Sequence, residues 1–143
     1  MKSLIIQGST VNNLDEKTMN QLSKNKKIYN VLKHTTGNPI STYDNQEMKE
    51  LIRYLLKMSK FLGITEPPEI EILQMIGQYI KDYWGFYTLE EVNNSIYLAI
   101  ESNEINHFNK LTPQFLNKIF TEYKKIRQKA IFQYRKTFEE LND

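Results

Sequence analysis

Glu101, Glu104 and His107 are the residues whose types and spacing come closest to metal chemistry. The Glu-x-x-His spacing of Glu104 and His107 puts a carboxylate and an imidazole on one face of a helix, as in carboxylate-bridged metal bundles. Such a site needs a second copy of the motif and two more inward glutamates, and the sequence has the motif once. We therefore interpret the three residues as surface polar groups near a helix end. No metal site and no cofactor are predicted.

The sequence offers few other candidates for a catalytic site. The chain has 5 glycines, no cysteine and 2 histidines, His34 and His107. It contains no glycine-rich phosphate-binding loop, and without cysteine it can form neither disulfides nor thiolate nucleophiles. Neither histidine lies near a serine nucleophile motif. The sequence therefore predicts a protein that is not an enzyme and has no catalytic residue.

The C-terminal segment carries cations in a regular pattern. Projection of residues 112–141 on a helix places four lysines in one narrow stripe, with two further cations flanking it and an aromatic ring projecting into it. Unpaired cations attract phosphates through counterion release, and an exposed aromatic ring can stack on a base. The stripe is either a solvated helix face, a nucleic-acid surface or a surface for an acidic protein. The candidate nucleic-acid-binding residues are Lys118, Lys124, Lys125, Lys129, Phe132, Arg135 and Lys136.

The opposite face of the same segment is apolar as far as Leu141. A helix of about 30 residues extends about 45 Å, whereas a compact chain of this length has a radius of gyration of about 14–15 Å. The distal end should therefore overrun a compact core, and either the N-terminal segment or another chain must cover it. Its predicted partner-binding residues are Tyr134, Phe138 and Leu141. Arg127 projects near the apolar side, where its head could reach a buried acid or a partner.

Helix signals from residue 44 onward indicate the elements that position these residues. Asp44 and Thr88 each precede a glutamate by three positions, which is the capping-box pattern. Gly63 can provide a left-handed stop, and Thr112 followed by Pro113 opens a last helix that runs to about Leu141. Residues 13–24 and 26–34 are predicted to form two short helices, residues 3–11 a strand or an unordered arm, and residues 35–39 a turn-rich connection.

The predicted fold class is all-α. We expect an irregular helical bundle of four main helices plus short N-terminal helices, with a long C-terminal helix. Residues 1–43 are assigned to an N-terminal arm with the short helices, and residues 44–143 to the bundle domain. The aromatic stretch KDYWGFYTLEEV, residues 81–92, is interpreted as a corner between two helices rather than a platform for stacking a ligand.

Charge is unevenly distributed along the chain. Residues 1–62 have 10 lysines and arginines against 5 acids, residues 63–111 have 2 against 8, and residues 112–143 have 7 against 4. An acidic middle between basic ends predicts internal complementarity or two surfaces for different partners. No apolar run approaches the roughly 20 residues that span a bilayer, and the apolar part of the N-terminus is short for a signal peptide. We expect a cytoplasmic protein without membrane contact.

The order of motifs from Pro68 to Ala130 resembles small helical proteins of phages and mobile elements. The resemblance is carried by PEIEILQMIGQYIKDYWGFYTLEEVNNSIYLAI and, after a polar spacer, LTPQFLNKIFTEYKKIRQKAI. Some of these proteins sit in replication modules and are thought to act as helicase loaders or inhibitors. The resemblance implies a non-catalytic adaptor in DNA replication, located in the cytoplasm of a host cell, which binds a replication protein. The C-terminal helix itself adds two further expectations, a second copy of the chain as the alternative partner and DNA at the lysine stripe.

Two other functions remain open from the sequence. One is a virion or assembly protein whose arm, residues 1–13, adds a strand to a neighbouring subunit through Leu4, Ile5 and Ile6. The other is an inhibitor of a host enzyme that uses the acidic middle segment as a mimic of nucleic acid.

Overall fold

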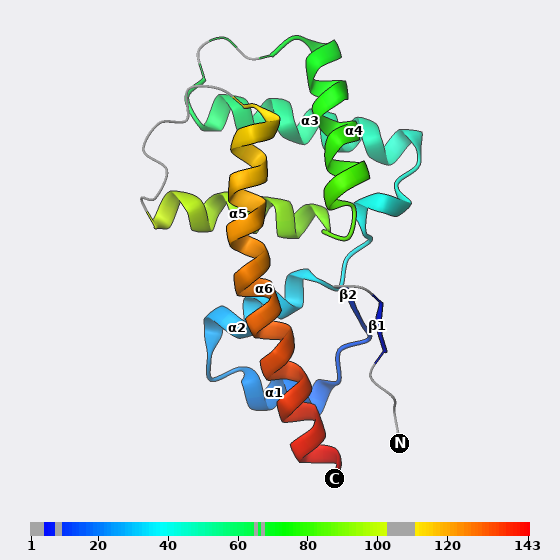
Figure 1. The fold of residues 1–143 in the computed structure, drawn as a ribbon, viewed down its shortest axis with the longest axis vertical. Helices are drawn as coiled ribbons and strands as arrows, with labels where there is room; N and C mark the ends of the chain where they lie inside the picture. The colour runs from blue at the N-terminus through cyan, green and yellow to red at the C-terminus, as the bar shows by residue number, and fades with distance from the viewer. Residues whose placement is uncertain (1–4, 8–9, 65, 67, 103–110) are drawn as a thin grey trace.

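The computed structural model describes residues 5–7, 10–64, 66, 68–102 and 111–143 (Figure 1). The described chain is all-α, as predicted, with one short antiparallel hairpin before the first helix. In chain order the elements are β1 (Ile5–Gln7), β2 (Thr10–Asn12), α1 (Glu16–Leu22), α2 (Lys26–His34), the 3-10 turn η1 (Ile40–Thr42), α3 (Asn45–Phe61), α4 (Ile70–Trp84), α5 (Leu89–Glu101) and α6 (Pro113–Asn142).

Local sequence signals set most of these boundaries. Both capping boxes are present, with Asp44 and Glu47 at the start of α3 and Thr88 and Glu91 at the start of α5. Gly63 has the positive φ of 78° expected of a left-handed stop. The helix α1 is shorter than predicted, because Asp15 caps it by accepting a hydrogen bond from the Thr18 N–H at 3.0 Å.

The long helix α6 runs along the molecule, and two groups of helices pack against it (Figure 1). Helices α3, α4 and α5 gather around its N-terminal half, and α1 and α2 lie beside its C-terminal half. Buried side chains of α1 and α2, such as Leu22 and Leu32, belong to the same core cluster as Leu51 and Ile80 of α3 and α4. Apolar packing is therefore continuous across residue 43, where the sequence suggested a boundary.

The N-terminal segment covers the distal half of α6. Tyr134 has no exposed surface, and its hydroxyl accepts a hydrogen bond from the Asp15 backbone N–H at 2.6 Å. The sequence predicted that either the N-terminal segment or another chain covers this region. At Tyr134 the N-terminal segment of the same chain does so. Tyr134 thus lies in the core of its own chain and not on a surface open to a partner. Phe138 stacks on Tyr134 and, like Leu141, is half-buried.

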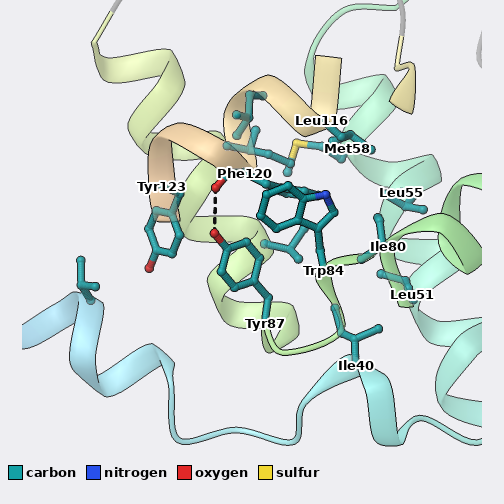
Figure 2. Close-up of a cluster of buried hydrophobic side chains, with 14 of the residues drawn as sticks. Ile40, Leu51, Leu55, Met58, Ile80, Trp84, Tyr87, Leu116, Phe120 and Tyr123 are labelled. Carbon is teal, nitrogen blue, oxygen red and sulfur yellow. Dashed lines mark hydrogen bonds between the residues drawn. The ribbon is translucent and has the colours of Figure 1, made fainter. Parts of the chain in front are cut away.

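The stretch of residues 81–92 forms the predicted corner between α4 and α5 (Figure 2). Trp84 stacks on Tyr87 with ring centroids 5.6 Å apart, and Phe120 of α6 meets both rings edge-on. The Tyr87 hydroxyl donates to the Phe120 carbonyl at 2.8 Å. Because Tyr87 is fully buried and Trp84 is 9% exposed, these two rings are core and not a ligand platform.

Position 85, where α4 ends, needs glycine because there is no room for a side chain. Its φ of −65° is accessible to any residue, so the left-handed conformation is not what selects glycine here. A Cβ at this position would lie 2.8 Å from the Ser41 Cβ and would also collide with the Lys81 carbonyl. The Ser41 N–H donates to the Gly85 carbonyl at 2.8 Å, so glycine allows η1 to approach the corner.

Helix α4 buries one apolar stripe and leaves other apolar side chains exposed. Trp84 takes a core position at the end of the helix, whereas Ile70 is 54% exposed and Tyr83 is 69% exposed. Apolar residues occur on several sides of this helix, so its periodicity alone does not select one face.

Candidate nucleic-acid interface

The predicted cationic stripe lies on a single unbroken helix. Helix α6 is continuous over 30 residues from Pro113 to Asn142. Lys118, Lys125, Lys129 and Lys136 are exposed, and the Phe132 ring is 67% exposed. Most of the apolar surface of this ring is therefore not packed against the protein and can contact a ligand. The stripe therefore has the composition expected of a surface that binds phosphates and stacks bases.

Part of the stripe lines a groove formed by three helices. The groove has a volume of about 700 Å³ and lies between the end of α5, the start of α2 and the adjacent side of α6. A second hollow shares Lys125 and Lys129 with it and extends to Phe132. The lining residues that could bind nucleic acid, hereafter the basic groove, are Lys27, Lys118, Lys125, Lys129 and Phe132.

The charges of the basic groove are incompletely paired. Two acids, Glu101 and Glu122, also line it. Glu122 pairs with Lys125 at 3.1 Å, with both side chains more than half exposed. An exposed pair of this kind contributes about 0–1 kcal/mol, so a phosphate can displace it. Within the described residues, no carboxylate lies within 4.0 Å of the Lys27, Lys118 or Lys129 amine.

Three of the predicted nucleic-acid-binding residues lie outside the groove. The Lys124 amine sits 5.9 Å from the centre of the Phe86 ring, at the α4–α5 corner. Arg135 and Lys136 are exposed nearer the end of α6 and do not line the groove. These residues can still contribute to the long-range field, but the structure does not bring them together with Lys118, Lys125 and Lys129.

Sequence reasoning missed Lys27, which comes from a different helix. Asn25 caps α2, accepting from the Ile28 N–H at 3.2 Å, and Lys26 and Lys27 occupy the first turn. A first turn normally favours acids, because the positive end of the helix dipole lies there. The first turn of α2 has no acid. Two lysines at this position were therefore a signal that the N-terminal segment belongs to the cationic surface.

A buried ion pair lies on the side of α6 opposite the stripe. Arg127 lies on the side of α6 opposite Lys118 and Lys129, and its Nε donates to the Glu91 carboxylate of α5 at 2.5 Å. Both side chains are fully buried, which confirms the prediction that Arg127 could reach a buried acid. Burial raises the pKa of Glu91, and the charge and hydrogen bond of Arg127 oppose that rise. The pair lies on the buried side of α6, so the lysines on the opposite side face solvent.

No protein-family model, curated protein or solved structure matches the chain.

Neither a metal centre nor a membrane span is found in the part of the chain that the structure describes. No group of three histidine, aspartate or glutamate side chains in the described residues could hold a metal ion. Glu104 and His107 lie outside those residues, while Glu101 is exposed at the end of α5. None of the described helices is both long enough and apolar enough to cross a bilayer.

Proposed function

We propose that the protein is a non-catalytic adaptor that binds single-stranded nucleic acid in the basic groove and a protein partner on a separate surface. The observation that carries the proposal is that a groove lined by four lysines from two helices adjoins a second hollow lined by the exposed ring of Phe132. Lysines along a channel follow a phosphate backbone, and an exposed ring stacks on unpaired bases. A duplex keeps its bases stacked on each other, so Phe132 favours a single strand.

The biological setting we propose is DNA replication of a phage or mobile element, in the cytoplasm of the host. Support for this setting comes from the resemblance of residues 68–130 to small helical proteins of such replication modules. The division of charge also supports it, because an acidic surface and a basic surface on one chain suit two different partners.

Neutralising the lysines of α6 tests the nucleic-acid half of the proposal. For the wild type, four lysines predict a slope of about −3 when the logarithm of the binding constant is plotted against that of the salt concentration. The variant carrying Lys118→Gln, Lys125→Gln and Lys129→Gln should reduce the magnitude of that slope by about 2. The measurement is fluorescence anisotropy of a labelled 20-nucleotide oligothymidine titrated across salt concentrations.

A matched control changes three lysines of α3. Lys49, Lys57 and Lys60 are also exposed, and their replacement by glutamine alters the net charge by the same amount. We expect the slope of this variant to stay close to that of the wild type. Equal losses from the two triple variants, or no binding by the wild type at low salt, would contradict the proposal.

The aromatic part of the groove is tested separately. Phe132→Ala should weaken binding of the oligothymidine by about 1–3 kcal/mol, with an unchanged salt slope, because stacking is lost and no charge is altered. The matched control is Phe61→Ala, which removes a ring that is 59% exposed on α3. If both variants bind like the wild type, Phe132 does not contact the bases.

A further inference from the structure

Helix α4 has two apolar faces, and only one of them is covered by the described chain. The inner face contains Leu73, Ile76, Ile80 and Trp84, all buried in the core. On the outer side, Ile72, Met75 and Tyr83 are 46%, 68% and 69% exposed. Exposed apolar side chains that lie together on a protein surface mark an interaction site. The outer side of α4 is therefore a candidate contact for a partner.

The outer residues form a line and are held in place. Ile72, Met75, Tyr79 and Tyr83 follow the spacing of three and four residues that keeps side chains on one side of a helix. The Tyr79 and Tyr83 rings lie 5.0 Å apart, and the Tyr79 hydroxyl donates to the Asn117 side-chain oxygen of α6 at 3.1 Å. These four residues, hereafter the α4 stripe, make an ordered apolar ridge along about three helical turns.

The surroundings of the α4 stripe are acidic. Four exposed carboxylates lie on α4 or just before it: Glu66, Glu69, Glu71 and Asp82. Lys81 is the one cation between residues 66 and 84, and its amine donates to the Tyr43 carbonyl at 2.8 Å. A second copy of the chain placed face to face on the stripe would bring the same carboxylates together, and like charges repel. A cationic partner avoids that cost.

We infer that the α4 stripe docks a basic amphipathic helix of a protein partner. An amphipathic helix presents apolar side chains at the same three- and four-residue spacing, so its ridge packs beside that of α4. Methionine adapts its shape to the partner, tyrosine offers both an apolar ring and a polar end, and the carboxylates pair with flanking lysines or arginines. The inference specifies the protein partner of the proposed adaptor and rests on that proposal.

The test uses a designed helix as the probe. A fluorescein-labelled 18-residue peptide of leucine and lysine, with all leucines on one helical face, is titrated with the full chain and followed by anisotropy. We expect the wild type to bind this peptide better than a scrambled peptide of the same composition, in which the leucines are spread around the helix. The double variant Met75→Gln, Tyr83→Gln should bind at least about tenfold more weakly, because two apolar side chains are lost from the contact.

The groove variant Phe132→Ala separates this inference from nucleic-acid binding. We expect Phe132→Ala to bind the peptide like the wild type, and the Met75→Gln, Tyr83→Gln variant to bind oligothymidine like the wild type. Both altered positions of α4 are exposed, so circular dichroism should show an unchanged fold. Equal peptide binding by the wild type and the α4 variant would overturn the inference. So would a wild-type dimer that the α4 variant converts to a monomer, since a second copy would then occupy the stripe.

Discussion

Replacement of Glu91 by alanine is expected to lower the free energy of unfolding by about 3–5 kcal/mol. Glu91 is fully buried and accepts a hydrogen bond from the Arg127 Nε at 2.5 Å. Without it, the Arg127 charge would remain in the core with no carboxylate beside it. The same substitution removes the oxygen that accepts from the Thr88 N–H at 3.1 Å, so the start of α5 would lose its capping box as well.

The surroundings of Arg127 offer little compensation for that loss. Its Nη1 and Nη2 are buried and have no hydrogen-bond partner among the described residues. The guanidinium lies over the rings of Phe86 and Tyr87, with its central carbon 5.4 and 5.7 Å from their centroids. Ring faces attract a cation, but they do not replace a buried carboxylate. Glu91 is therefore the one ionic partner of Arg127 within the described chain.

Two controls accompany the Glu91→Ala measurement by urea-induced unfolding. Glu90→Ala removes an exposed neighbouring carboxylate and should change stability by no more than about 0.5 kcal/mol. The double variant Glu91→Leu, Arg127→Met replaces the ion pair by apolar side chains and should recover most of the lost stability. A loss below about 1 kcal/mol for Glu91→Ala would show that Glu91 and Arg127 do not form a buried pair in solution.

Features that depend on residues close in the chain were predictable from the sequence. Capping boxes at Asp44 and Thr88 and the Thr112–Pro113 start of α6 involve positions three or four residues apart, so each signal is complete within one helical turn. The continuity of α6 follows from the absence of glycine and proline between residues 114 and 142. The burial of Arg127 was suggested by its place on the apolar face, but the identity of its partner was not.

Features that depend on packing between distant elements were not predictable. Periodicity placed Lys118, Lys125 and Lys129 on one side of α6, but it carries no information about the helices that border that side. Lys27 joins them only because α2 folds against α6. In the same way, the sequence showed that Tyr134 needed a cover and left open which segment supplied it. The exposed apolar side of α4 was not predicted, because apolar residues occur on more than one side of this helix.

The protein is also expected to unfold between about pH 10 and pH 12, because buried tyrosines would have to ionise. Burial raises the pKa of Tyr123 from 10.0 to about 12, and the hydrogen bond from the Asn94 side chain opposes part of that rise. Burial also raises the pKa of Tyr87, which is fully buried beneath the α4–α5 corner. Both hydroxyls are neutral below pH 10, so their full contribution to stability is present there.

The sign and size of the alkaline effect follow from these pKa changes. Because the folded pKa exceeds the unfolded one, the unfolded chain loses its protons first as pH rises, and stability falls from pH 10 upward. The rise in the pKa of Tyr123 from 10.0 to about 12 corresponds to a loss of about 2 kcal/mol by pH 12. Tyr87 adds to this loss in the same direction. The combined loss approaches the lower end of the total stability of about 5–15 kcal/mol that is usual for a single domain.

Trp84 provides the readout of this transition, since it stacks on Tyr87 within the core. Its fluorescence and the helical circular dichroism should change together between pH 10 and pH 12 at constant ionic strength, and both should recover on return to pH 8. Tyr123→Phe removes one ionising group and should move the midpoint to higher pH, whereas Tyr83→Phe, at a position that is 69% exposed, should leave it unchanged. If phenolate absorbance instead shows all tyrosines titrating in one step near pH 10 while the helices persist, Tyr87 and Tyr123 are open to solvent, and the core around the corner is not packed as described.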